Sequence, residues 1–130
     1  MEINARMFSP LLQIYRQCLQ NGDPVEALLN MGSNMPVKSP EFKGSYGMNS
    51  MITTYTSGRA DELLDYNEVN QVKEIRPLYA STDNVPLPNG DQGTMLAIAD
   101  ITAESYQGVL DKYEEICGRV VKMPQWSPSF

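Results

Sequence analysis

Hydrophobic residues recur at helical spacing near both ends of the chain. Between residues 103 and 121, apolar positions three and four residues apart predict one amphipathic helix, with Thr102 as its N-cap. The apolar stripe of this helix comprises Tyr106, Val109, Leu110, Tyr113, Ile116, Cys117 and Val120. Its opposite side carries mostly charged residues, so the helix should cover one face of a core.

Two shorter helices are predicted close to the beginning of the chain. The first should start at Ser9 and Pro10, because a serine caps the free amides and a proline suits the first helical position. The second should start at Asp23 in the same way and end at Gly32. The connection between the two helices is very short, which predicts a helical hairpin.

Three segments in the middle of the chain have the composition of β-strands. Residues 48–56 contain β-branched and aromatic side chains, residues 71–81 alternate in polarity, and residues 94–101 are almost entirely apolar. The last segment should be the most buried strand. Pro77 should place the second strand at a sheet edge or a bulge, because proline cannot donate a ladder hydrogen bond.

The segments between these elements predict connections and, with the elements, an α+β fold. Residues 33–47 predict a long loop, residues 82–93 a hairpin turn at Asn89-Gly90, and residues 59–69 either one helical turn or an irregular acidic connection. We therefore expect an N-terminal helical hairpin, a small antiparallel sheet of three to four strands covered on one face by helices, and a long C-terminal helix. Residues 1–123 should form a single domain, followed by an extended tail over 124–130.

Composition and charge narrow the classes of ligand. The 130-residue chain is 42% hydrophobic and 20% charged, which is typical of one globular domain. Its net charge of −6 is uneven, since residues 1–60 have five basic and four acidic side chains, whereas residues 61–130 have five basic and twelve acidic ones. Nucleic-acid binding needs clustered lysine and arginine, so direct contact with nucleic acid is not expected.

The chain shows no apolar run long enough for a membrane span and no pattern of a secretion signal at residues 1–10. We expect it in the cytoplasm or as part of an assembled particle. Cys18 and Cys117 each fall on the apolar stripe of a predicted helix, which favours two reduced core thiols. The alternative is a disulfide between those helices, which would require an oxidising compartment.

The sequence contains no histidine, which removes the commonest general base and metal ligand, and it shows no glycine-rich phosphate loop. We therefore expect no cofactor, no metal, no small-molecule substrate and no catalytic residue. One alternative is a carboxylate site for a divalent metal at Asp61, Asp65 and Glu68, which would share a face of a helix. The simpler interpretation of this run is a solvated acidic face, and residues 82–93 are explained by turn geometry.

Methionines and a C-terminal aromatic segment point to protein partners. Met51 and Met95 are expected to fill the core, whereas Met7, Met31, Met35 and Met123 lie at element ends and in loops. The tail is extended by its prolines and cannot bury its two large aromatic groups locally, so it should pack on its own chain or anchor in a partner. The predicted partner-binding residues are Trp126, Phe130, Pro124, Met123, Met35, Phe42 and Tyr46.

These patterns favour a non-enzymatic structural or assembly protein. We expect an accessory subunit of a larger complex, such as a decoration, connector or tail component of a virus or phage particle, in contact with copies of itself or with other subunits. The alternative is a small acidic inhibitor or regulator that binds a basic protein surface, steered by its charge. Salt separates the two, because an acidic inhibitor loses its partner at high ionic strength and an apolar anchor does not. The metal enzyme is the second alternative.

Overall fold

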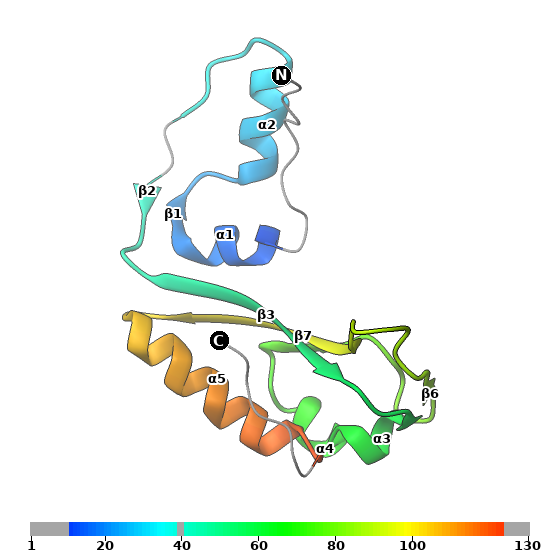
Figure 1. Ribbon diagram of the computed structural model, residues 1–130. Coiled ribbons are helices and arrows are strands. Elements are labelled where there is room, and N and C mark those ends of the chain that lie inside the picture. Colours follow the sequence, from blue (N-terminus) through cyan, green and yellow to red (C-terminus); the bar gives the residue numbers. More distant parts are fainter. Residues whose placement is uncertain (1–10, 39–40, 124–130) are drawn as a thin grey trace.

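The computed structural model describes residues 11–38 and 41–123, and it confirms the mixed α+β class. A three-stranded antiparallel sheet lies at the centre, in the order β3 (Tyr46–Thr54), β7 (Thr94–Ala103) and β5 (Ile75–Pro77). Figure 1 shows α5 (Tyr106–Val120) along one face of this sheet and α1 (Leu12–Cys18) across the other. Helices therefore lie on both faces, not on one face as the sequence predicted.

A strand of the sheet forms at each of the three predicted segments, although residues 71–81 contribute only the three residues of β5. β7 is the central strand, and its buried residues form the middle of the core, as its apolar composition predicted. β5 is an edge strand that ends at Pro77, where the missing amide costs no ladder hydrogen bond. β3 pairs with β7 along its whole length, from Tyr46 opposite Ala103 to Thr54 opposite Thr94, with a bulge after Ile52.

Helix α5 forms where its spacing predicted, with two local differences. Its N-cap is Ser105, whose hydroxyl accepts a hydrogen bond from the Gly108 amide at 3.0 Å. Thr102 instead belongs to β7 and donates to the Gln17 side chain on α1, so the cap predicted there is wrong. Tyr106, predicted in the apolar stripe, is the first residue of the helix and is 65% exposed. The buried face comprises Val109, Tyr113, Ile116, Cys117 and Val120.

The N-terminal part contains strands as well as the predicted helices. β1 (Leu19–Asn21) follows α1 directly and pairs with β2 (Glu41–Phe42), so the interval 33–47 is not entirely loop. Between the two strands lies α2 (Pro24–Gly32), which begins and ends where the sequence predicted. Gly22 has φ +83°, a left-handed conformation that glycine adopts freely between β1 and α2.

The central connections differ from the predicted turns. Residues 59–69 form two single helical turns, α3 (Ala60–Leu63) and α4 (Tyr66–Val69). The segment before β7 does not make a tight hairpin at Asn89-Gly90, although β5 and β7 do pair antiparallel. It contains β6 (Asn84–Val85), which pairs with β4 (Gly58–Arg59) in a separate two-stranded sheet.

The two cysteines are free and buried on opposite faces of the sheet, Cys18 on α1 and Cys117 on α5, which excludes the disulfide alternative. Within the described part of the chain, no helix is both long enough and apolar enough to cross a membrane.

Gly47 determines how closely α1 approaches the sheet. A Cβ at this position would clash with Cγ2 of Ile14 and lie 3.0 Å from Sγ of Cys18. We expect Gly47→Ala to lower the free energy of unfolding by about 1–3 kcal/mol, because a side chain forced into a packed contact displaces its neighbours. Urea unfolding measures this change. Hydrogen exchange of the α1 amides should also become faster.

The matched control is Gly118→Ala on α5, where an added Cβ would meet nothing within 4 Å. This substitution should raise the free energy of unfolding by up to about 1 kcal/mol, since alanine is the better helix former. Equal effects of the two substitutions would show that the close contact at Gly47 does not limit the packing of α1.

Candidate interaction surface

Helix α2 presents its large apolar side chains to solvent. None of its residues is buried, and Leu29 is 66% exposed. The half-buried positions Pro24, Ala27 and Asn30 follow a spacing of three and share one face, whereas the stripe on the other face is 37% exposed at Val25 and 38% at Leu28. An amphipathic helix normally turns its apolar stripe to the core, so this orientation leaves the stripe available to a partner.

Polar contacts, rather than burial of its side chains, position α2 on the rest of the chain. The Asp23 side chain caps the helix by accepting hydrogen bonds from the amides of Val25 at 2.8 Å and Glu26 at 3.4 Å. Its other oxygen accepts from Nε of Arg16 on α1 at 2.9 Å. The hydrogen bonds from Arg16 and the Val25 amide lower the pKa of Asp23 below its usual value. At the other end, Asn34 takes a left-handed conformation with φ 55°.

Exposed apolar side chains continue beyond α2 toward the sheet. Three residues predicted to bind partners, Met35, Phe42 and Tyr46, are all exposed. The backbone of Phe42 on β2 pairs with that of Leu19 on β1, and the side chain of Phe42 is exposed. We call the exposed large apolar side chains of residues 24–38 and 41–46 the N-terminal apolar surface. Its exposed large apolar side chains are Val25, Leu28, Leu29, Met31, Met35, Val37, Phe42 and Tyr46.

The other predicted partner residues lie elsewhere. Met123 is half-buried and packs against the chain's own core, so only part of its side chain remains for a partner. Pro124, Trp126 and Phe130 fall outside the described residues. Met51, expected in the core, is 42% exposed on β3. Its neighbour Ser50 contacts α5, and side chains alternate along a strand, so Met51 points away from the face that α5 covers.

Sequence reasoning missed Val25, Leu28, Leu29 and Val37 as candidate contact residues. Their helical spacing was visible, but an apolar stripe is normally assigned to the core. The low charge of the segment was the available signal, since Glu26 is the only charged residue between Pro24 and Val37. A segment with almost no charged side chains loses little favourable hydration when a partner covers it.

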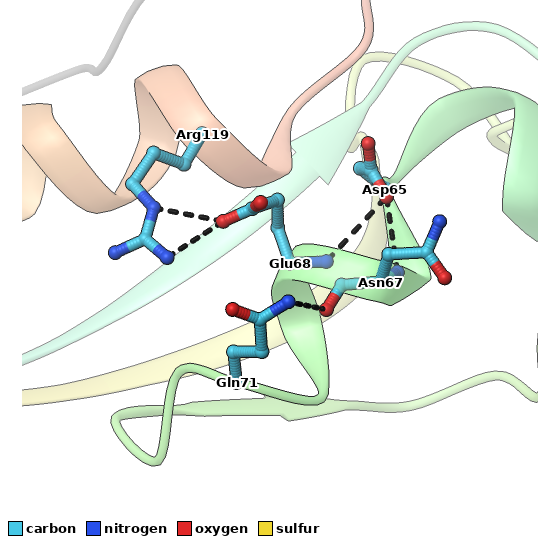
Figure 2. Close-up of polar contacts among 5 residues, drawn as sticks. All are labelled: Asp65, Asn67, Glu68, Gln71 and Arg119. Atoms are coloured by element: carbon cyan, nitrogen blue, oxygen red, sulfur yellow. Dashed lines mark hydrogen bonds and ion pairs between the residues drawn. The ribbon is translucent and has the colours of Figure 1, made fainter.

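Acidic residues of 59–69 take part in contacts within the protein itself, and Figure 2 shows those of Asp65 and Glu68. Asp65 caps α4 by accepting hydrogen bonds from the amides of Asn67 and Glu68. Glu68 accepts from Nε and Nη2 of Arg119 at 2.9 and 2.6 Å, which ties α4 to α5. Asp61 pairs with the neighbouring Arg59 at 2.6 Å.

These carboxylates therefore do not form the divalent-metal site that the sequence offered as an alternative. The helix breaks between Leu63 and Tyr66, so Asp61, Asp65 and Glu68 do not share a helical face. Among the described residues, no three acidic or thiol side chains lie close enough together to hold a metal ion.

One buried carboxylate, Asp100 on β7, was not singled out in the sequence. It accepts hydrogen bonds from Nδ2 of Asn49 on β3 at 2.7 Å and from Nη2 of Arg76 on β5 at 2.7 Å. A buried charge is tolerated when it is paired and hydrogen-bonded. Asp100 thus joins all three strands of the sheet from the face where α1 packs.

A second buried polar contact lies on the opposite face of the sheet. The Ser50 hydroxyl on β3 donates to the Tyr113 hydroxyl on α5 at 3.0 Å. Burial raises the pKa of Tyr113 to about 12, although the hydrogen bond from Ser50 acts to lower it. Burial also raises the pKa of the neighbouring Cys117 to about 11, so its thiol stays protonated and unreactive near neutral pH.

No protein-family model, curated protein or solved structure matches this chain. The fold and surface together define a small α+β protein with an exposed, nearly uncharged helix on one side. Its function is inferred from the chemistry of that surface.

Proposed function

We propose that this protein is a non-enzymatic structural subunit that acts through protein contacts within a larger assembly. The observation that carries the proposal is the N-terminal apolar surface, where eight large apolar side chains between Val25 and Tyr46 are exposed. Large apolar side chains exposed in such number within a short segment of a small globular chain are typical of a protein-interaction site. Exposed aromatic and methionine side chains are enriched in such interfaces.

Several carboxylates of the described residues are engaged in structural hydrogen bonds. Asp65, Glu68 and Asp100 each accept hydrogen bonds that cap a helix or tie neighbouring elements together. This supports a binding role over a catalytic one. More specifically, we propose an accessory subunit of a virus or phage particle, such as a decoration, connector or tail component. A small chain with exposed apolar side chains suits this role, because such subunits work by binding other subunits.

The test is the size of the tagged chain in an extract of the cells that produce it. We expect the wild-type chain to elute from a sizing column in a complex well above its own 14.5 kDa. A variant with Leu29→Ser, Phe42→Ser and Tyr46→Ser should elute at its own mass. The matched control replaces three exposed apolar residues elsewhere, with Tyr55→Ser, Leu87→Ser and Tyr106→Ser, and should stay in the complex.

The same column run at high salt separates this proposal from the acidic inhibitor. An apolar contact persists when ionic strength rises, whereas a contact made by the acidic half of the chain is screened and lost. Elution of the wild-type chain at its own mass, or loss of the complex in salt alone, would contradict the proposal.

A further inference from the structure

We propose that α2 is a self-association helix, which pairs antiparallel with α2 of a second copy about a two-fold axis. This inference rests on the proposed assembly function and names one of its contacts. The outward stripe of α2 consists of Val25, Leu28, Leu29 and Gly32, which helical spacing places on one face. That face lies opposite the half-buried face of Pro24, Ala27 and Asn30.

The stripe is self-complementary. When two antiparallel copies meet with their centres between Leu28 and Leu29, each Leu28 lies opposite Leu29 of the second copy. Val25 then lies opposite Gly32, where an added Cβ would meet nothing within 4 Å, so a larger side chain from the second copy has space. A two-fold contact requires such matching, because the same surface serves both partners.

Charge also favours a second copy at this surface. The acidic excess of the chain lies in residues 61–130, whereas residues 24–37 contain a single charged residue, Glu26, so two copies can meet there with little charge repulsion. Figure 1 shows α2 on the far side of α1 from the sheet, whereas α5 lies beyond the sheet. The exposed acidic residues of α5 therefore point away from the paired helices. They are Asp111, Glu114 and Glu115.

The size of the surface sets the expected strength. Stable interfaces involve about 20–30 residues on each side. Residues 24–37 provide fewer, so this pairing should be weak by itself and strengthened by the other contacts of an assembly. We expect a dissociation constant on the order of micromolar or weaker, seen as a molar mass that rises with concentration.

The first test is sedimentation of the purified full chain up to millimolar concentration. The wild-type mass should rise from 14.5 kDa toward twice that value. Leu29→Glu should remain monomeric and folded by circular dichroism, because it places a charge at the centre of the contact. Leu87→Glu is the control, since Leu87 is 70% exposed but lies in the segment before β7. A wild-type chain that is monomeric throughout, or equal association of the two variants, would overturn the proposal.

The second test is oxidative cross-linking, which reports the orientation. Antiparallel pairing brings Leu29 of both copies close to the two-fold axis, whereas the two Val25 residues lie about 10 Å apart along the helices at 1.5 Å per residue. A disulfide needs Cα atoms within roughly 7 Å. Leu29→Cys should therefore form a linked dimer quickly and Val25→Cys slowly, while a mixture of Val25→Cys and Gly32→Cys should form the mixed dimer. Fast linking of Val25→Cys alone would show a parallel contact and contradict the proposal.

The outcomes distinguish this inference from the proposed function. A purified chain that stays monomeric but enters a large complex in the cell extract removes the α2 pairing and leaves the assembly role. A purified chain that dimerises but shows no larger complex in the extract supports the pairing and contradicts the role in a larger assembly.

Discussion

Replacing Tyr113 with alanine should lower the free energy of unfolding by about 3–5 kcal/mol, the cost of removing a large buried side chain from a packed core. Tyr113 is 1% exposed and is one of the largest fully buried side chains of the described residues. It fills the space between α5 and the sheet, and its hydroxyl meets Ser50 on β3 at 3.0 Å. Alanine would remove the ring and leave the Ser50 hydroxyl without this partner.

The matched control is Tyr106→Ala, which makes the same chemical change on the same helix. Tyr106 is exposed at the start of α5, so its loss should cost less than about 1 kcal/mol, as is usual for surface positions. Urea unfolding monitored by circular dichroism gives both values. Similar losses in the two variants would show that α5 does not pack on the sheet through Tyr113.

The second large effect is a loss of stability in alkaline solution. Burial raises the pKa of Cys117 from 9.0 to about 11 and that of Tyr113 from 10.0 to about 12. The unfolded chain therefore releases these protons at lower pH than the folded chain does. The stabilisation is complete below about pH 9 and is lost as pH rises through roughly 9 to 12. A difference of about two pH units corresponds to about 2–3 kcal/mol for each group.

The measurement is the urea midpoint between about pH 8 and pH 11. Burial also raises the pKa of Tyr66, whose hydroxyl donates to the Tyr79 carbonyl at 2.6 Å, and this adds to the same trend. Tyr113→Phe keeps the ring but removes one titrating group, so its stability should fall less steeply than that of the wild type. An unchanged midpoint across this range would mean that the two groups titrate alike in both states.

Local chemistry explains the elements that were predicted correctly. Asp23 and Pro24 begin α2, and the apolar run of 94–101 forms the central strand, because caps and strand composition act within a few residues. Pro77 lies in an edge strand, as predicted, because proline has no amide hydrogen to donate to a second neighbouring strand. The buried face of α5 includes Tyr113, Ile116 and Val120, and it follows from helical periodicity.

The misassigned features depend on contacts between distant residues. Thr102 was expected to cap α5, but it lies in β7 and bonds Gln17, which is remote in sequence. The pairs β1–β2 and β4–β6 join short segments whose composition alone resembles loop. The sequence predicts Glu68 as part of a solvated acidic face, whereas in the structure it accepts hydrogen bonds from Arg119 of α5.

For the candidate surface, local sequence accounts for the formation of α2, for its apolar stripe and for the single charged residue, Glu26, within residues 24–37. Capping, periodicity and composition are properties of neighbouring residues, so they could be recognised without coordinates. Which side of α2 faces its own chain follows from packing between elements and cannot be read from neighbouring residues. That orientation depends on a contact between distant elements, in which Arg16 of α1 donates to the Asp23 cap, and it leaves Pro24, Ala27 and Asn30 half-buried and Leu29 exposed.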